Sequence, residues 1–468
     1  RPLIHETAIC SGRTSPRSDS NQVGGSTSRS SGSTSPDGPS RLTRASPLSG
    51  VRSMFTSMSA PPFCRVTSGT DAAGTPLDYQ PATTPILPEV QDTLQKLYLE
   101  EYGNPSSPYL LGRRARDLLE ESRSRLADLL GVKAAELIFT SGGSEGNNMV
   151  LRQLLFLEKS GHLIVSAVEH PSVLETANWL SRKKNLDLSI LPVDQTGKVK
   201  PETLEASIQP NSCMVSVMAA NNETGTIQPF REMARIARNA GVDFHSDCVQ
   251  YAGKLDLNLA SSGLDYATLT AHKMGGPKGI GLLYIREGSQ LFPLISGGGQ
   301  ERSLRAGTEN IALACAFAES LDWFSSHRSK LENQWLSYRN YLLQQLQDLE
   351  IFFLLGDPET NLPNTLNLGF RGISAESLLI CLDLDGIAVS TGSACSSGAL
   401  EASHVLLAMG CSHQEAKSSL RISMGWNTTE EDIDQLANRL VHHVQRLKPI
   451  SGKSSSPTRS ITEMLEES

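Results

Sequence analysis

Short apolar stretches alternate with amphipathic ones through the first half of the globular part of the chain. HLIVSAV (162–168) and CMVSVMA (213–219) are apolar runs of strand length. PSVLETANWLSRKK (171–184) and FREMARIARNAG (230–241) have the spacing of amphipathic helices, and a glycine ends the second. Buried strands that alternate with helices are typical of a largely parallel sheet covered on both faces. Five further runs predict strands: ELIFT (136–140), DLSILPV (187–193), VDFHSD (242–247), YATLTAHK (266–273) and GIGLLYIR (279–286).

The pattern changes after about residue 325, where helices are grouped and strands are fewer. This arrangement predicts a smaller α+β domain. Its expected elements are a helix over 330–348, TLNLGF (365–370), a helix over 374–385, IAVST (387–391), helices within 401–420, LRISMG (420–425) and a last helix capped by Thr428 and Glu431. The predicted fold class is therefore α/β, a large domain with a mainly parallel sheet flanked by helices plus a smaller α+β domain. The expected bounds are 91–325 for the large domain, 326–450 for the small one, and 77–90 for an N-terminal segment packed on the small domain.

The two ends of the chain differ in composition from the rest. Residues 1–76 are rich in Ser, Gly, Pro, Thr and Arg, and such a segment buries too little apolar area to fold. An Arg- and Ser-rich, acid-poor segment fits a transit peptide to a mitochondrion or plastid. The alternatives are a disordered tail or untranslated sequence, and a cytoplasmic location would then be expected. Residues 451–468 are polar and are predicted to form a mobile tail.

Composition and charge exclude several classes of protein. A chain of 468 residues is too long for one compact core. The net charge of −8 argues against a nucleic-acid binder, which needs a basic face. No run approaches the roughly 18 apolar residues of a membrane span. The eight cysteines contain no C-x-x-C pair, so the usual zinc-ribbon and ferredoxin spacings are absent and no metal site is predicted.

Three candidate binding features follow predicted strands of the large domain, at the strand ends where α/β sheets bind ligands. TSGGSEGNN (140–148) ends a strand and opens a helix, so Gly143 and Ser144 can hold a phosphate, although an ordinary glycine-rich turn has the same pattern. Asp247 ends a strand, where a carboxylate either pairs with a cationic ring nitrogen or caps a helix. His170 begins a helix, where an imidazole either stacks on a planar ring or packs in the core.

Three more residues carry candidate chemistry. Lys273 ends an apolar strand, and partial burial there would give a neutral amine able to form a Schiff base, unless the side chain extends into solvent. Cys395 lies in the Gly/Ser-rich stretch STGSACSSG (390–398), which is typical of an exposed thiol, the alternative being a cysteine packed at a strand end. Arg421 can clamp a carboxylate or form a surface ion pair. A phosphate cradle, a ring-nitrogen carboxylate, a stacking histidine and a Schiff-base lysine together describe pyridoxal 5'-phosphate.

Ten motifs in order resemble the cysteine desulfurase family (NifS/IscS-like), within the class V aminotransferase group of fold-type I pyridoxal phosphate enzymes. The resemblance covers residues 77–448. The motifs are LDYQPATTP, GNPSSPY, FTSGGSEGNN, VEHPSVL, ANNETGTIQP, HSDCVQYAGK, TAHKMGGPKGIG, GGGQERSLRAGTEN, STGSACSSG and SSLRISMG.

The resemblance implies a role for each candidate residue. Lys273 would hold the cofactor and Cys395 would be the nucleophile, with His170 as a further catalytic residue stacked on the ring. The implied contacts to the cofactor ring are Asp247 at the pyridine nitrogen and Gln250 at the phenolic oxygen. The implied phosphate contacts are Gly143, Ser144, Thr270 and His272, with Thr308 reaching the phosphate of the partner subunit in a homodimer. Asn222 and Arg421 would bind the substrate carboxylate.

The resemblance also implies the reaction. The family converts L-cysteine to L-alanine and transfers the sulfur as a persulfide, here on Cys395, to an acceptor or scaffold protein for iron–sulfur cluster or other sulfur-compound assembly. A selenocysteine lyase, which forms alanine and selenide from L-selenocysteine, shares several of the motifs. A catalytically silent sulfur-assembly partner is the alternative from another class, and a plain aminotransferase would not need Cys395. Neither a nucleic acid nor a membrane is an expected partner.

Overall fold

The computed structural model describes residues 75–76, 83–156, 161–184, 186–391 and 402–448. The chain divides into two compact units, Arg1–Thr67 and Ser68–Ser468, and all the described residues belong to the second. Residues 1–74 of the expected targeting extension, the expected C-terminal tail and Cys395 lie outside the described residues.

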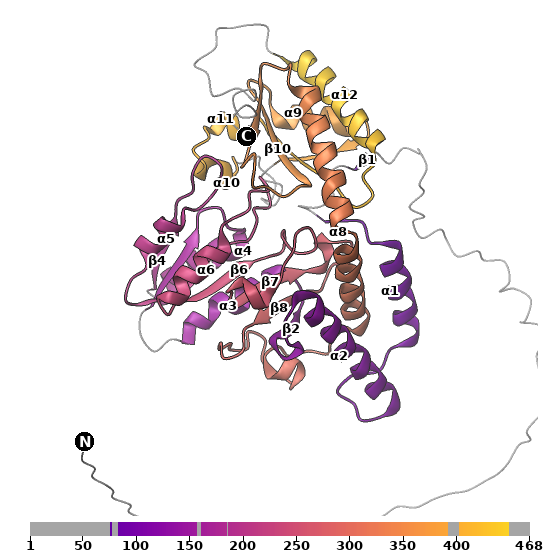
Figure 1. Ribbon diagram of the computed structural model, residues 1–468. Coiled ribbons are helices and arrows are strands. Elements are labelled where there is room, and N and C mark those ends of the chain that lie inside the picture. The colour runs from indigo at the N-terminus through magenta and orange to yellow at the C-terminus, as the bar shows by residue number, and fades with distance from the viewer. Residues whose placement is uncertain (1–74, 77–82, 157–160, 185, 392–401, 449–468) are drawn as a thin grey trace, which may run out of the picture. The chain divides into compact units, whose positions relative to one another are not determined.

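A seven-stranded sheet forms the larger part of this unit (Figure 1). Strand β8 is antiparallel to both of its neighbours, and every other adjacent pair in this sheet is parallel. The strand order β2-β8-β7-β6-β5-β3-β4 confirms the predicted α/β class. The strands are β2 (Leu137–Thr140), β3 (His162–Ser166), β4 (Asp187–Leu191), β5 (Ser212–Ser216), β6 (Asp243–Asp247), β7 (Tyr266–Thr270) and β8 (Gly281–Ile285).

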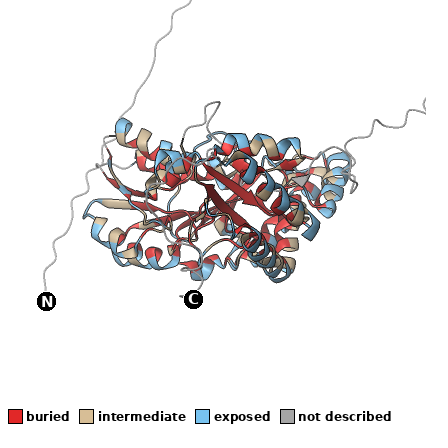
Figure 2. Cartoon of the chain, turned by 90° about the horizontal axis from the view of Figure 1, so that it is seen from above, coloured by how far each residue is buried: buried red, intermediate tan, exposed pale blue. Residues whose placement is uncertain are grey.

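Helices cover both faces of this sheet because successive side chains of a strand point to opposite sides. In β3, Leu163 and Val165 pack with α3 and α4 in one apolar cluster, while Ile164 between them packs with α2, α5, α6 and α8 in another. Figure 2 shows the strands as buried and the outer faces of the helices as exposed. The helices are α1 (Pro88–Glu100), α2 (Leu110–Leu130), α3 (Gly143–Arg152), α4 (Pro171–Lys184), α5 (Pro201–Ser207), α6 (Phe230–Asn239), α7 (Leu259–Ser262) and α8 (Ile311–Leu346).

A smaller antiparallel sheet of order β12-β13-β10-β9 follows α8. Its strands are β9 (Phe352–Leu355), β10 (Thr365–Phe370), β12 (Ser390–Thr391) and β13 (Ser419–Ser423). The helices around it are α9 (Ala375–Leu384), α10 (His404–Ala408), α11 (His413–Ala416) and α12 (Glu430–Leu447), and a separate two-stranded pair joins β1 (Thr75–Pro76) to β11 (Ile387–Ala388). Among the described helices, none is both long and apolar enough to cross a bilayer.

Several predicted bounds were wrong. The helix expected over 330–348 begins 19 residues earlier, at Ile311, and runs through the expected domain boundary. Strand β9 was not predicted, and IAVST (387–391) forms two short strands instead of one. The capping box of the last helix is formed by Thr429 and Asp432, one residue after the predicted pair.

Candidate active site

The candidate residues follow strands whose carboxyl ends share one edge of the large sheet. Strands β3, β5, β6 and β7 are parallel, and β2 runs in their direction because β8 is antiparallel to both β2 and β7. The residues that follow these ends are Gly143 and Ser144 after β2, His170 after β3, Asn222 after β5, Asp247 at the end of β6, and Lys273 after β7. Binding sites of open α/β sheets form at this edge.

Lys273 lies in a tight turn and is only 7% exposed. The turn is held from outside by Thr84, whose backbone N–H donates to the carbonyl of His272 at 3.0 Å. The hydroxyl oxygen of Thr84 accepts a hydrogen bond from the N–H of Gly275 at 2.7 Å. Lys273 also lowers the pKa of two imidazoles, those of His170 and His272, with burial as the larger cause for each. The ε-amine is therefore inside the structure and near the candidate histidines.

The carboxylate of Asp247 receives an N–H donor on each oxygen. Asn147 Nδ2 donates to Oδ2 at 2.7 Å, and the backbone N–H of Val249 donates to Oδ1 at 3.0 Å. Asp247 is 6% exposed and Asn147 is 1% exposed. Both partners are N–H donors, so the carboxylate acts only as an acceptor here and can face a protonated ring nitrogen.

A chain of hydrogen bonds connects Asp247 with His170. Asn147 Nδ2 also donates to the hydroxyl of Ser172 at 2.9 Å, and that hydroxyl lies 2.8 Å from His170 Nδ1. The backbone N–H of Ser172 donates to the same Nδ1 at 3.1 Å. Nδ1 is therefore an acceptor, and a neutral imidazole must carry its proton on Nε2. Burial lowers the pKa of His170, which Asp247 opposes and Lys273 and His404 reinforce, so the ring is neutral at physiological pH.

The start of α3 has the geometry that an anion site requires. Gly143 is the first residue of this ten-residue helix, whose free N–H groups can bind a phosphate. A Cβ on Gly146 would lie 2.7 Å from Thr268 Cγ2, so glycine lets α3 pack closely on β7. Ser144 is exposed. Of the other expected phosphate ligands, Thr270 donates its hydroxyl proton to the carbonyl of Ile280 at 2.9 Å, and burial lowers the pKa of His272 to about 4, so that it is neutral.

The smaller sheet brings Arg421 to the same edge. Arg421 lies in β13, is 3% exposed, and its Nη1 donates to the carbonyl oxygen of Asn222 at 3.4 Å. Gln250 is 5% exposed and accepts a hydrogen bond from Lys254 Nζ at 2.8 Å. Arg421 and Gln250 are thus buried in this region of the structure, and Asn222 is half-buried.

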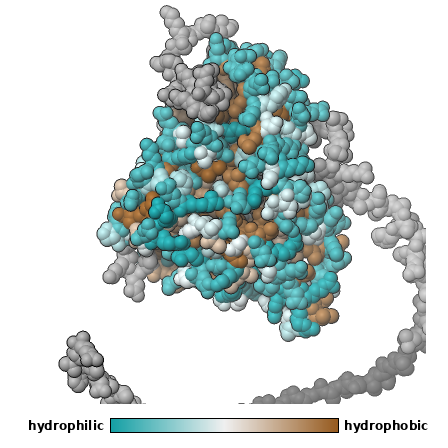
Figure 3. Space-filling view, viewed as in Figure 1, coloured by the Kyte–Doolittle hydropathy of each residue, from teal (hydrophilic) through white to brown (hydrophobic). Residues whose placement is uncertain are grey.

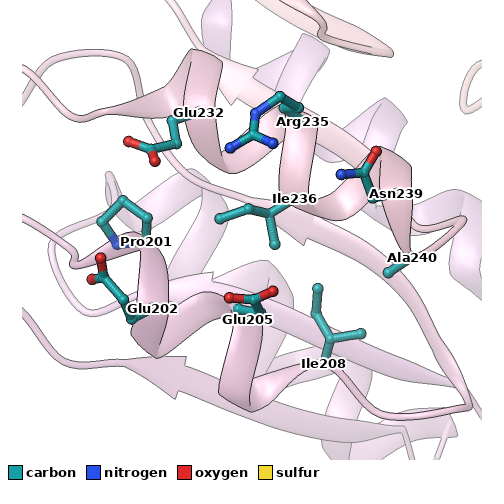
Figure 4. A pocket seen from close by; sticks show the side chains of 9 residues that line it. All are labelled: Pro201, Glu202, Glu205, Ile208, Glu232, Arg235, Ile236, Asn239 and Ala240. Atoms are coloured by element: carbon teal, nitrogen blue, oxygen red, sulfur yellow. The ribbon is translucent and has the colours of Figure 1, made fainter.

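Of the remaining predicted residues, one is described and lies apart from this group. Thr308 is exposed on the chain's surface, and Cys395 lies outside the described residues. A surface cleft of about 370 Å³ between α5 and α6 is lined by Glu202, Glu205 and Arg235 among others (Figure 4). None of the predicted site residues lines that cleft, so it is not the candidate active site. In the described part of the chain, no group of three His, Cys, Asp or Glu side chains is arranged to hold a metal ion.

Sequence reasoning missed Asn147, Ser172 and Lys254. Asn147 and Asp247 are 100 residues apart, and only the packing of α3 on the sheet brings them together. The one available signal was Gly146, since a glycine inside a helix often marks close packing.

The donor set fits pyridoxal phosphate. A buried lysine, a carboxylate with two donors, a neutral imidazole and the glycine-rich start of a helix meet the needs of its aldehyde, ring nitrogen, ring face and phosphate. The aminotransferase class-V family model matches residues 77–436. The fold and the site thus define a member of the class-V aminotransferases, whose cofactor is pyridoxal phosphate.

Similar curated proteins and solved structures show which family within the class-V aminotransferases the chain belongs to. Cysteine desulfurase IscS of Dictyoglomus turgidum is 40% identical over 378 residues, 80% of this chain and 95% of that protein. Cysteine desulfurase IscS of Methanosarcina thermophila is 37% identical over 382 residues, 81% and 94% of the two chains. A solved NifS-like protein matches with a TM-score of 0.75 and 35% identity over 80% of this chain and all of that one. The NifS-like protein from Rickettsia africae matches with a TM-score of 0.71 and 32% identity over 80% and 99%. The chain belongs to the cysteine desulfurase family.

Proposed function

We propose that this protein is a pyridoxal phosphate-dependent cysteine desulfurase that converts L-cysteine to L-alanine. The sulfur would pass to Cys395 as a persulfide, and from there to an acceptor or scaffold protein for iron–sulfur cluster or other sulfur-compound assembly. The observation that carries the proposal is the buried Lys273 beside the hydrogen-bonded chain from Asp247 to His170. The names of the curated relatives support the choice of cysteine as substrate.

Several residues would bind the cofactor. Pyridoxal phosphate, when bound, supplies an electron sink that stabilises negative charge on the amino acid and weakens its bond to sulfur. Lys273 would hold it, Asp247 would keep a proton on its ring nitrogen, and the phosphate ligands would be Gly143, Ser144, Thr270 and His272. The hydroxyl of Thr270 donates within the chain, so its share of phosphate binding requires that bond to be exchanged.

His170 and Arg421 would act on the substrate. Because His170 Nδ1 accepts two local hydrogen bonds, His170 holds its proton at Nε2 and enters the reaction as a proton donor there. Arg421, beside Asn222, would bind the substrate carboxylate through its guanidinium fork. In the overall reaction L-cysteine loses its carbon–sulfur bond, Cys395 gains a sulfur–sulfur bond, and the proton of the Cys395 thiol balances the carbon that becomes the methyl group of alanine.

Four of the five described cysteines are weaker candidates than Cys395 for the nucleophile. Burial raises the pKa of the Cys248 thiol to about 12 and that of Cys411 to about 11. Burial also raises the pKa of Cys213 and of Cys315. A thiol must ionise to attack sulfur, so these four are poor nucleophiles near neutral pH.

Mass spectrometry after exposure to L-cysteine tests the proposal. The peptide that carries Cys395 should gain one sulfur atom, and alanine should be released. Cys395→Ser should abolish both results while the protein keeps its visible cofactor absorption, and Lys273→Ala should lose that absorption as well as turnover. Cys411→Ser is the matched control and should behave as wild type. Full desulfuration by Cys395→Ser would refute the nucleophile assignment, and strong turnover of L-selenocysteine without turnover of L-cysteine would favour the lyase.

The proposal includes a homodimer, supported by one surface of the chain. Large side chains are exposed where α1 ends and α2 begins, Tyr102 at 77% and Leu110 at 70% among them. Figure 3 shows hydrophobic surface over these helices. Asn310 Nδ2 donates to the hydroxyl of Tyr98 at 3.2 Å, which places the segment after Thr308 beside this surface. Leu110→Glu should shift the mass in sedimentation equilibrium from dimer to monomer, and a wild-type monomer would contradict the proposal.

The proposed layout of the chain has a large cofactor-binding domain over 91–325 and a small domain over 326–450. In support, strands β2 to β8 all precede residue 325, and the four antiparallel strands follow it. Residues 1–76 would direct the protein to an organelle. A fluorescent fusion of these residues tests that part, and a diffuse cytoplasmic signal would contradict it.

A further inference from the structure

Lys254 is a fully buried lysine to which the proposed reaction gives no task. Its exposed fraction is 0%, and it follows β6 by seven residues. Burial of a lysine is costly unless its amine is hydrogen-bonded or neutral. Burial, together with Lys273 and Arg421 nearby, holds the pKa of Lys254 well below its usual range. The buried amine of Lys254 is therefore expected to have a specific role near Lys273.

The turn that carries Lys254 packs against the turn that carries Lys273. Gly253 has a φ of +78°, a conformation that favours glycine, and a Cβ there would lie 3.2 Å from the Cβ of Met274. Met274 directly follows Lys273, so this turn packs against the turn that carries the candidate lysine. The N–H of Lys254 donates to the carbonyl of Tyr251 at 3.3 Å, which closes the turn.

The amine of Lys254 donates to Gln250 Oε1 at 2.8 Å. A glutamine amide has one acceptor end and one donor end, and the amine of Lys254 meets the acceptor end. Gln250 is 5% exposed, and among the described residues no group accepts a hydrogen bond from its Nε2. The contact with Lys254 therefore determines which end of the amide is available to a ligand.

We propose that Lys254 is a positioning residue that fixes the Gln250 amide with its Nε2 toward the cofactor, so that Gln250 donates to the ionised phenolic oxygen of pyridoxal phosphate. This inference rests on the proposed function, because the ring contact of Gln250 belongs to it. If Lys254 were absent, the amide could turn and present a carbonyl oxygen to an anionic oxygen. The ring would then lose a hydrogen bond and meet repulsion.

A double-mutant cycle on the full chain tests the inference. Lys254→Met keeps the length of the side chain and removes the donor, and Gln250→Leu removes the amide. Each protein is stripped of cofactor and then titrated with pyridoxal phosphate, with the visible spectrum recorded. Lys254→Met should weaken binding roughly three- to tenfold, the usual worth of one hydrogen bond. It should also shift the visible band in the same direction as Gln250→Leu, and the double variant should show no further change. Lys133→Met, which removes an exposed lysine, is the control and should match wild type.

Gln250→Glu tests the same point without changing Lys254. It keeps an acceptor for the amine but replaces the Nε2 donor with oxygen, so it should weaken binding at least as much as Gln250→Leu. Wild-type binding by Lys254→Met, additive effects in the double variant, or unchanged binding by Gln250→Glu would each overturn the inference. A wild-type protein that forms no visible band with pyridoxal phosphate would instead overturn the proposed function itself.

Discussion

Replacing Arg123 with Met should destabilise the protein far more than removing an ordinary surface charge. Arg123 lies in α2, and its two terminal nitrogens donate to the two oxygens of Glu301 at 2.7 and 2.8 Å. The two side chains are 3% and 1% exposed. Glu301 also accepts the backbone N–H of Phe139 at 2.9 Å. The pair thus ties the segment that leads to Thr308 onto the edge of the large sheet.

The magnitude follows from burial and backbone strain. Removing one member of a buried ion pair leaves the other charged and unpaired, which costs about 3–5 kcal/mol. Glu301, Arg302 and Ser303 all have positive φ, at 45°, 57° and 65°, which is strained for residues other than glycine. Only firm contacts hold such a backbone in place, and the contact with Arg123 is one of them.

Arg125, which lies two residues after Arg123 in α2, provides a matched control. It pairs with Asp322 at 2.9 Å, but these side chains are 44% and 48% exposed. Exposed pairs are worth about 0–1 kcal/mol. Urea unfolding of the holoenzyme, followed by tryptophan fluorescence, compares Arg123→Met with Arg125→Met. Equal losses of stability in the two variants would refute the reasoning, as would a double variant of Arg123→Met with Glu301→Met that recovers none of the loss.

Three further predictions concern the surroundings of the site. Asn147→Ala removes a donor to the carboxylate at the end of β6, so it should weaken pyridoxal phosphate binding about tenfold in titrations, whereas Asn148→Ala next to it should not. Burial raises the pKa of Glu169 to about 8, so the native state keeps a proton that an unfolded chain loses near pH 4.5. Stability should therefore fall from about pH 4.5 to 8, and the unfolding free energy of Glu169→Gln relative to wild type should rise over that range; a constant difference would contradict this. Gly146→Ala should destabilise by about 1–3 kcal/mol in urea, and Thr268→Ser should restore part of it by removing the methyl group that a Cβ would meet.

The elements with clear periodicity were predictable from sequence. Helix α4 has the predicted bounds, and β6 ends at Asp247 as expected. The start of α8 was missed because the stretch from Ile311 to Ala318 is apolar throughout and mostly buried, so it shows no polar face. Its apolar and alanine-rich sequence therefore lacked the contrast on which helix prediction depends. The capping box moved by one residue because Thr428 and Thr429 stand side by side and both precede acidic residues by three.

Some residues of the candidate site could also be predicted from the sequence, and others could not. Lys273, Asp247 and His170 are marked by their places at strand and helix ends, which the sequence pattern shows. Asn147 bonds Asp247 and Lys254 bonds Gln250, through side chains whose partners depend on how a helix and a turn pack. Such contacts follow from three-dimensional packing, which no local pattern encodes. The predicted target of Thr308 belongs to a second chain, and Thr308 is exposed in the single chain.

Helix α8 runs for 36 residues, about 54 Å, without a break. Near its start, Cys315 accepts a hydrogen bond from Ser122 of α2 at 3.2 Å, and further along Trp335 donates to Gly425 after β13 at 3.0 Å. Helix α8 is thus joined to α2, which packs on the large sheet, and to the segment that follows β13 of the small sheet. A large rotation of one sheet against the other would have to bend this helix. Asn222 follows β5 of the large sheet and Arg421 lies in β13 of the small one, so such a rotation would also change the spacing of these two residues. A continuous α8 would therefore keep that spacing constant.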